Sequence, residues 1–497
     1  MTTAAADAEN KADIAALAKG GRTNFFGFLL RLVARIPFLF IASRLYGAAA
    51  MGRFASALVM VEFAGMLATL GQKRGLAARL AEDKEHPAHV VADALLLSTL
   101  FSAGAMALLY LFPQAMFPKG NFSRADVMLA SAVWLLAMGD LALAALAYRF
   151  DVATTVRARA VVEPWALSLS AGALYFIVPE SGLSLAYLIS VGAATGVALV
   201  ALARSYGAPR GWMPAPGHLA RIAHRNLPLA GADAVEWGTR KLDVFILRFF
   251  VGEAPLGIYF FAQQFASLPQ KLKTSFEPVL GPVITRNVRD ENFGAIARQV
   301  CQVGFWITAA QAGIALALAI PGTGLMGLGG PDFVKGTGAL TFLLVAEVVA
   351  ATAVVSEAAL VYVARYQNFV LSLLTILLQG LLTVGGIVLV RDAGWDDGWR
   401  IAAAAAALMF SLATASVLKA RLLARVLGKP INNFRRALAW AVVPAIAVGA
   451  AARTLLPEWA MMALGIPAIL GIYVWMLWHK GFGPEDRVLF RKEVAPG

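Results

Sequence analysis

Apolar stretches of about 18–25 residues, separated by short charged segments, recur along the whole sequence and constrain its fold more than any other feature. A helix of that length crosses about 30 Å of hydrocarbon. Hydrophobic residues make up 59% of the 497 residues and charged residues 15%, which leaves too little polar surface for a water-soluble fold. Because the backbone in lipid must satisfy its own hydrogen bonds, the stretches predict helices and an all-α integral membrane protein.

We predict 14 transmembrane helices, and the charges of the loops between them predict their orientation. The spans are 25–43, 54–72, 89–111, 125–147, 161–178, 184–203, 226–250, 257–280, 300–320, 337–363, 369–390, 401–418, 437–452 and 460–478. With the N-terminus inside, the inside segments hold 28 Lys and Arg residues and the outside segments hold 8. Positively charged loops resist translocation, so we expect a multi-pass protein of the plasma (inner) membrane with both termini in the cytoplasm.

An internal repeat relates the two halves of the chain. Residues 35–59 match residues 240–264 at a constant offset of 205, so that Arg35 aligns with Arg240, Gly47 with Gly252 and Gly52 with Gly257. We interpret the glycines as permitting the tight outside turn between two spans. A Gly-x-x-x-Gly pair at Gly192 and Gly196 predicts a close contact between helices. Both copies of the repeat begin inside, and parallel halves of this kind place a transported substrate at their interface.

The repeat predicts two parallel six-helix lobes around a central cavity, plus two C-terminal helices. In order, the segments are a cytoplasmic N-terminal segment (1–24), the N-lobe (25–203), a basic cytoplasmic linker (204–225), the C-lobe (226–418), a basic cytoplasmic loop (419–436), spans 13 and 14 (437–478) and a cytoplasmic tail (479–497). The two basic loops suit anionic membrane lipids as partners. The net charge of +13 follows from these loops and does not indicate a nucleic acid partner.

The first predicted hairpin has a recognisable pattern. Residues 27–35 read GFLLRLVAR, residues 40–47 read FIASRLYG and residues 51–54 read MGRF. This pattern resembles the opening hairpin of polysaccharide flippases in the multidrug/oligosaccharidyl-lipid/polysaccharide (MOP) exporter superfamily, and spans 7 and 8 resemble it more weakly. The resemblance implies a two-lobed fold that moves a polyprenyl-diphosphate-linked oligosaccharide from the cytoplasmic to the outer leaflet.

Cations inside the predicted spans are the candidate substrate site. A charge at the centre of a span costs roughly 2.5–3.5 kcal/mol, so these side chains should face protein or water. Guanidinium groups bind phosphate oxygens in pairs. We therefore expect a headgroup phosphate site in the cavity, and its candidate residues are Arg35, Arg240, Arg31 and Lys241. The alternative interpretation, which the sequence leaves open, is that these cations form internal salt bridges.

Acids in the same spans have two possible roles. Glu236 and Asp243 lie within one helical turn of Arg240, and Glu62 should lie level with Arg35 across the first hairpin. Such acids can neutralise the cations. A carboxylate in a low-dielectric cavity can also exchange a proton as the cavity alternates between sides, and Glu347 and Glu62 are the candidates for this ion coupling.

These features predict a transporter with no cofactor, no metal and no enzymatic activity. The leading hypothesis is a flippase for lipid-linked oligosaccharide in O-antigen, capsule or exopolysaccharide assembly, working by alternating access beside polysaccharide polymerase and chain-length machinery. A cation-coupled multidrug antiporter of the same superfamily is the first alternative, because acids in the spans suit organic cations. A membrane-embedded polymerase or ligase is less favoured, because no predicted outside loop exceeds 16 residues. The sequence has no P-loop motif, which argues against ATP hydrolysis.

Overall fold

The structure is a computed structural model that describes residues 35–82, 86–274, 277–483 and 486, without the side chains of 271–282. The chain forms two compact units that divide between Phe260 and Phe261, and we call them the N-terminal unit and the C-terminal unit. All regular secondary structure in the described ranges is helical. The prediction of an all-α fold is confirmed.

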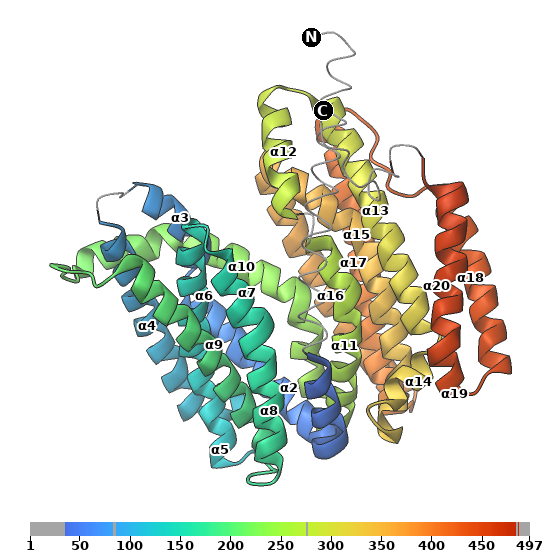
Figure 1. Ribbon diagram of the computed structural model, residues 1–497, viewed down its shortest axis with the longest axis horizontal. Coiled ribbons are helices and arrows are strands. Elements are labelled where there is room, and N and C mark those ends of the chain that lie inside the picture. The colour runs from blue at the N-terminus through green and yellow to red at the C-terminus, as the bar shows by residue number, and fades with distance from the viewer. Residues whose placement is uncertain (1–34, 83–85, 275–276, 484–485, 487–497) are drawn as a thin grey trace. The chain divides into compact units, whose positions relative to one another are not determined.

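The N-terminal unit is a bundle of long helices joined by short turns (Figure 1). After a first helical segment at 35–41, its elements are η1 (Ala42–Tyr46), α2 (Gly47–Ala68), α3 (Gln72–Glu82), α4 (Pro87–Leu111), η2 (Pro113–Ala115), α5 (Arg124–Val127), η3 (Met128–Ser131), α6 (Ala132–Tyr148), α7 (Val152–Val156), η4 (Arg157–Val162), α8 (Glu163–Tyr175), α9 (Gly182–Tyr206) and α10 (Pro216–Phe250). The helix α11 (Glu253–Thr274) begins in this unit and continues into the next.

Helix α2 forms the centre of the N-terminal unit. It packs against α4, α6 and α10, and its side chains Met51, Phe54 and Val61 are buried. Helix α6 in turn packs against α9, and α9 against α8. Helix α3 packs against α6 and α10, and the charges described below lie on α3, α6, α8 and α10.

The glycines of the repeat have two different roles. Gly47 has a φ of +81°, a value that side chains disfavour, and it ends the π-helical segment η1 where the predicted outside turn occurs. Gly52, by contrast, lies inside α2, and a methyl group on it would collide with the backbone of Glu253 and Gly257. The interpretation of Gly52 as a turn residue is therefore wrong. Gly52 and its repeat equivalent Gly257 instead let α2 and the start of α11 touch backbone to backbone.

The predicted contact at Gly192 and Gly196 is not formed in the described residues. A methyl group on Gly192 would reach only the Cδ1 atom of Leu135, at 3.7 Å, and one on Gly196 would meet no atom within 4 Å. The Gly-x-x-x-Gly spacing thus does not mark the tightest helix contact of this chain.

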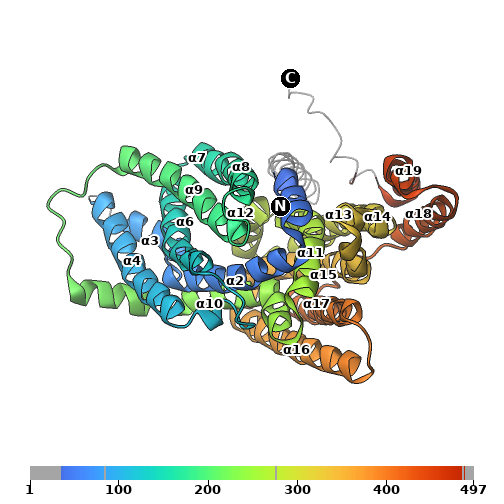
Figure 2. The ribbon, with the colours of Figure 1, turned by 90° about the horizontal axis from the view of Figure 1, so that it is seen from below.

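The C-terminal unit is a second bundle, with a helical hairpin at one edge (Figures 1 and 2). Its further elements are α12 (Glu277–Arg289), α13 (Phe293–Ala319), α14 (Gly322–Gly327), η5 (Pro331–Gly336), α15 (Thr337–Val363), α16 (Arg365–Asp392), α17 (Asp397–Leu427), α18 (Arg436–Leu455), α19 (Glu458–Ala460), η6 (Met461–Gly465), α20 (Ile466–Met476) and η7 (Leu477–Gly481). Helix α15 packs against α13 and α17, and α18 packs against α20.

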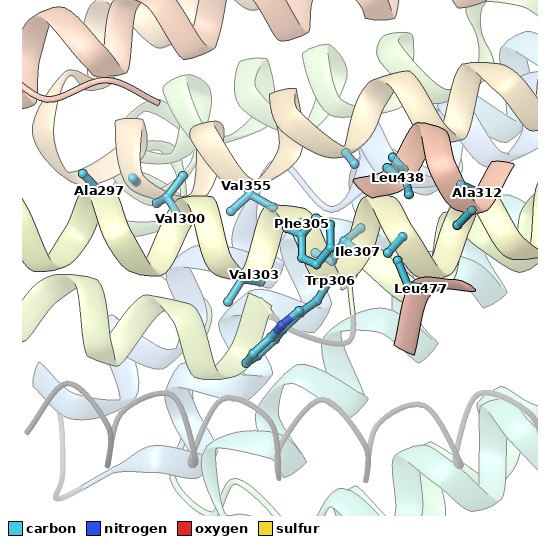
Figure 3. Close-up of a cluster of buried hydrophobic side chains, with 14 of the residues drawn as sticks. Ala297, Val300, Val303, Phe305, Trp306, Ile307, Ala312, Val355, Leu438 and Leu477 are labelled. Atoms are coloured by element: carbon cyan, nitrogen blue, oxygen red, sulfur yellow. The ribbon is translucent and has the colours of Figure 1, made fainter. Parts of the chain in front are cut away.

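A hydrophobic cluster joins the helices of the C-terminal unit. Figure 3 shows Phe305, Trp306 and Ile307 of α13 beside Val355 of α15 and Leu438 of α18, and all five are almost fully buried. In lipid, association between helices depends on close packing rather than on the exclusion of water. The cluster therefore explains how the hairpin of α18 and α20 stays attached to α13.

A buried carboxylate at Asp486 adds a polar tie to this attachment. It accepts hydrogen bonds from the indole of Trp306, the amide of Gln302, the backbone N–H of Gly483 and the guanidinium of Arg435, the last at 2.6 Å. The Arg435 guanidinium also lies 4.1 Å above the ring of Phe305. Because Arg435 precedes α18 and Asp486 follows η7, the tie holds both ends of the hairpin on α13.

The helices follow the predicted spans closely. The tenth predicted span, 337–363, has the same bounds as α15, and the sixth, 184–203, lies within α9. In the described ranges, ten helical segments are long and apolar enough to cross a membrane. The helices α8, α10 and α11 are not among these ten, and α10 carries ionised side chains along its length. The count of 14 spans stays a prediction.

The compact N-terminal unit extends beyond the predicted N-lobe, 25–203. It includes α10, which we assigned to the C-lobe, because α10 packs against α2, α3 and α4. Arg35 and Arg240, which we expected on opposite lobes, thus belong to one unit. The predicted segment boundaries stay predictions about the two sequence halves.

Candidate functional site: a ladder of charges in the N-terminal unit

Arg159 is the most connected cation of the N-terminal unit. It lies on the π-helical segment η4, where its guanidinium donates to Asp140 of α6 at 2.5 Å and to Glu163 of α8 at 2.9 Å. Each of these acids has a second cation: Lys73 lies 3.8 Å from Asp140, and Arg35 lies 3.9 Å from Glu163. Four helices and the segment η4 are thereby joined in one chain of alternating charge.

Arg74 joins α3 to α10 in a second chain. Its Nε donates to Asp233 and its Nη2 donates to Glu236, both at 2.5 Å. Glu236 also accepts the guanidinium of Arg240, one turn along α10, at 3.0 Å. The predicted pair of Glu236 and Arg240 is confirmed. The helices approach closely here because the turn before α3 contains Gly71, whose φ is +67° and whose added methyl group would strike Ala230 of α10.

Glu62 and Lys241 form a third contact between α2 and α10, with 3.4 Å between Oε2 and Nζ. That Glu62 lies level with Arg35 across the hairpin stays a prediction. The ion pairs of the two residues differ, because Glu62 meets Lys241 of α10, whereas Arg35 lies 3.9 Å from Glu163 of α8. Asp243, the other acid near Arg240 in sequence, is buried and accepts the hydroxyl of Tyr259 at 2.5 Å.

We call these eleven residues the charge ladder. Its cations are Arg35, Lys73, Arg74, Arg159, Arg240 and Lys241, and its acids are Glu62, Asp140, Glu163, Asp233 and Glu236. The ladder has one more cation than acid. It is buried on one side, where Asp233 is 10% exposed and Glu163 14%, and open on the other, where Arg35 is 45% exposed and Arg74 44%. The open side can offer guanidinium donors to a ligand.

Arg31, the fourth candidate for phosphate contact, lies outside the described residues. Arg240 lies beside Glu236 as the sequence predicted, whereas Arg35 and Lys241 pair with Glu163 and Glu62, which the sequence analysis had not assigned to them. Lys73 and Arg74 were assigned to an inside loop, but α3 is helical from Gln72. Arg159 was assigned to the loop before span 5. The role of Arg159 could have been predicted from Asp140, because an acid within span 4 requires a nearby cation in lipid.

The C-terminal unit holds a smaller set of charges. Glu347, a candidate for ion coupling, is buried in α15. Glu357, on the same helix, accepts Nζ of Lys419 at 2.9 Å, and Lys419 also donates to Ser372 at 3.0 Å. The sequence analysis placed Lys419 in a cytoplasmic loop, because it ended span 12 at 418. Helix α17 continues to Leu427, so Lys419 is instead a buried partner for Glu357.

Outside the predicted spans, α3 and α10 are joined once more. The Arg225 guanidinium donates to both carboxylate oxygens of Glu82, at 2.8 and 3.2 Å, and these bonds hold the pKa of Glu82 below its usual range. No group of three or more His, Cys, Asp and Glu residues in the described ranges could hold a metal ion. The charge ladder is therefore the candidate site.

A comparison with protein families bears on what this site is for. A family model described as "polysaccharide biosynthesis protein" matches residues 41–318, which is more than half of the chain. The chain belongs to this family. The matched range contains the whole charge ladder except Arg35. A search of curated proteins gave no match.

Solved structures of MOP superfamily transporters share the fold. The lipid II flippase MurJ, in an inward closed conformation, matches with a TM-score of 0.70 at 11% identity, over 91% of this chain and 99% of MurJ. A multidrug resistance MATE family transporter in an inward-facing conformation matches with a TM-score of 0.62 at 14% identity, over 80% of this chain and 98% of the transporter. A MOP superfamily transporter from Pyrococcus furiosus matches with a TM-score of 0.60 at 14% identity, over 84% of this chain and 96% of the transporter. These matches show that the chain has the fold of MOP superfamily transporters, and the protein is a multi-pass membrane protein.

Proposed function

We propose that this protein is a flippase that moves a polyprenyl-diphosphate-linked oligosaccharide from the cytoplasmic to the outer leaflet by alternating access, for the assembly of O-antigen, capsule or exopolysaccharide. The observation that carries the proposal is the charge ladder, with its excess of cations and its exposed guanidinium groups, in a member of a polysaccharide biosynthesis family. The MurJ-like fold supports it.

The physical reason is the chemistry of the headgroup. A diphosphate with attached sugars cannot enter hydrocarbon unaided, because its charge and its hydrogen bonds would be unsatisfied. Arg35, Arg74 and Arg240 each hold an acid on one side and keep an exposed guanidinium edge on the other. Charged side chains at membrane depth face protein or water, so we expect this open side to line a water-filled cavity in which a phosphate can replace water. Lys241 and Arg31 have the same proposed role.

Transport of a labelled substrate tests the proposal. Purified protein is placed in vesicles with a fluorescent polyprenyl-diphosphate oligosaccharide, and its movement between leaflets is timed. We expect protein-dependent movement that Arg35→Gln and Arg240→Gln each slow by at least about tenfold, since a hydrogen bond to a charged group is worth about 1.5–3 kcal/mol. Arg298→Gln, at an exposed arginine of α13, is the control and should leave the rate unchanged.

The possible failures of this experiment have different meanings. If no movement depends on the protein, the flippase proposal is removed. If movement is normal in both arginine variants, the flippase stands and the phosphate contact does not. A polymerase or ligase would instead lengthen or transfer the labelled glycan, which analysis of the recovered lipid detects.

A cation-coupled multidrug antiporter is the second candidate, because the ladder also holds five acids and the fold is shared with a MATE family transporter. Glu236→Gln separates the two. Glu236 is 48% exposed and lies between Arg74 and Arg240. Removing its charge should leave the uptake of an anionic headgroup intact or faster, and should slow the export of an organic cation.

Ion coupling is assigned to Glu62 and Glu347 within the same proposal. Glu62 lies 3.4 Å from Lys241, so a proton taken up by Glu62 would release that lysine toward the cavity. Glu347 lies at low exposure in α15.

A further inference from the structure

A small pocket at the end of the N-terminal unit opposite α3 is separate from the charge ladder. Four stretches that we predict on or next to the outside surface line it: the start of α2, the loop after η2, the end of α10 and the start of α11. It contains about 240 Å³ of empty space, part of it open to the surroundings.

Arg248 forms the floor of this pocket. The residue is 3% exposed, and its Nη1 donates to the carbonyl oxygen of Ser56 at 3.0 Å. Its guanidinium lies 4.9 Å from the ring centre of Phe245 and 4.7 Å from that of Phe249. Its Nε has no hydrogen-bond partner, and no acid of the described residues forms an ion pair with it. Burying a cation without an anion costs free energy, and a bound anion would reduce this cost.

Two more cations stand at the mouth of the pocket. Lys119 lies on the surface and donates to the carbonyl oxygen of Phe249 at 3.2 Å, which leaves two ammonium hydrogens free to bind a ligand. Arg53 lies 4.0 Å from Glu253, at the limit of an ion pair. Three cations thus face one acid around the pocket.

The start of α11 adds a partial positive charge. This 22-residue helix begins at Glu253, and its first N–H groups have no partner within the helix. Helix N-termini bind anions through these groups. The helix end would not define a site by itself, but here it adjoins a buried guanidinium whose Nε is unpartnered.

We infer that this pocket is an anion site, which binds a phosphoryl group through Arg248, Lys119 and Arg53 at the outside end of the N-terminal unit. The excess of two positive charges matches a phosphate dianion. The group can belong to the headgroup of a lipid or be free phosphate, and the chemistry of recognition is the same. The site concerns binding alone, so it does not depend on the proposed transport.

Two binding measurements on the full-length protein distinguish the sources. In the first, protein in a neutral detergent is titrated with inorganic phosphate, and the heat of binding is recorded. In the second, protein in nanodiscs of phosphatidylcholine with one-tenth phosphatidic acid is analysed for lipid that stays bound. Binding in the first measurement identifies free phosphate as a ligand. Binding in the second alone identifies a lipid headgroup.

Variants test the residues. Arg248→Met keeps the bulk of the side chain and should weaken binding at least about tenfold, and Lys119→Gln, at an exposed position, should weaken it about threefold or more. Glu253→Gln removes the one acid among the residues that line the pocket and should tighten binding, which a purely structural role would not produce. Arg124→Gln, at an exposed outside arginine, is the control and should bind like the wild type.

The proposal is overturned by either of two results. One is the absence of phosphate and of phosphatidic acid binding in the wild-type protein. The other is binding that Arg248→Met, Lys119→Gln and Glu253→Gln leave equal to that of the Arg124→Gln control.

Discussion

Gly52 and Gly257 are equivalent residues of the internal repeat, and the fold brings them into contact. Each would place a methyl group against the backbone of the other helix, on Glu253 for Gly52 and on Ala48 for Gly257. Backbone cannot move aside as the end of a flexible side chain can. The two glycines are therefore required by packing, and their recurrence in both halves has a geometrical reason.

Replacing Gly52 by Ala should destabilise the protein. Overpacking costs about 1–3 kcal/mol, and a collision with backbone belongs at the upper end of that range. We expect the midpoint of thermal unfolding in detergent to fall by roughly 5–10 °C. Gly104→Ala is the matched control, since Gly104 lies within α4 and a methyl group there would meet no atom within 4 Å. Equal midpoints for the two variants would show that α2 and α11 do not touch in this way.

At the scale of elements, ion pairs and hydrogen bonds with other helices hold the charged helices in the bundle. Helix α10, predicted as the span 226–250, is not among the ten described segments that are apolar enough to cross a membrane, and its acids and cations pair with Arg74 of α3 and Glu62 of α2. The C-terminal hairpin is held in the same way, because the carboxylate of Asp486 accepts hydrogen bonds from Trp306 of α13 and from Arg435, which precedes α18.

Asp486→Asn should loosen this hairpin. The amide keeps the size of the carboxylate but loses the charge that pairs with Arg435, and breaking a buried ion pair costs about 3–5 kcal/mol. We expect faster hydrogen exchange within 436–481 and little change in the N-terminal unit, as measured by mass spectrometry of the detergent-solubilised protein. Asp290→Asn serves as the control, because Asp290 is exposed and contacts only the adjacent Arg289. Identical exchange in the two variants would contradict the role of the tie.

At the scale of the whole molecule, the orientation in the membrane rests on the charges of the loops. Each inside segment of the prediction carries Lys or Arg, whereas two of the outside segments, 179–183 and 251–256, carry none. Translocation disfavours positive loops, so reversing the chain would place most of its positive charge on the wrong side.

Labelling of single cysteines tests this orientation. Cys301 is first replaced by Ser, and a cysteine is then introduced by Asn121→Cys in an outside loop or by Arg210→Cys in the inside linker, both at exposed positions. An impermeant thiol reagent should label Asn121→Cys in intact cells and Arg210→Cys only after the membrane is opened. The reverse pattern would overturn the topology and, with it, the outside location of the anion pocket.

The sequence by itself determined the features that depend on neighbours along the chain. Length and hydropathy predicted α15 to the residue, because a span needs only its own apolar side chains and backbone bonds. The pair of Glu236 and Arg240 followed from helical spacing, since residues four apart share a face. The pattern of the opening hairpin indicated the superfamily.

Only the tertiary structure decided which helix faces meet. Glu62 of α2 pairs with Lys241 of α10. Arg159 of η4 joins Asp140 of α6 to Glu163 of α8. These contacts depend on how each helix is rotated about its axis against its neighbours. That rotation is set by close packing at sites such as Gly71 and Gly52, whose partners lie some 160 to 205 residues away. The periodicity of a sequence shows which side chains share one face of a helix. The packing of the whole unit decides which face of a neighbouring helix lies against it.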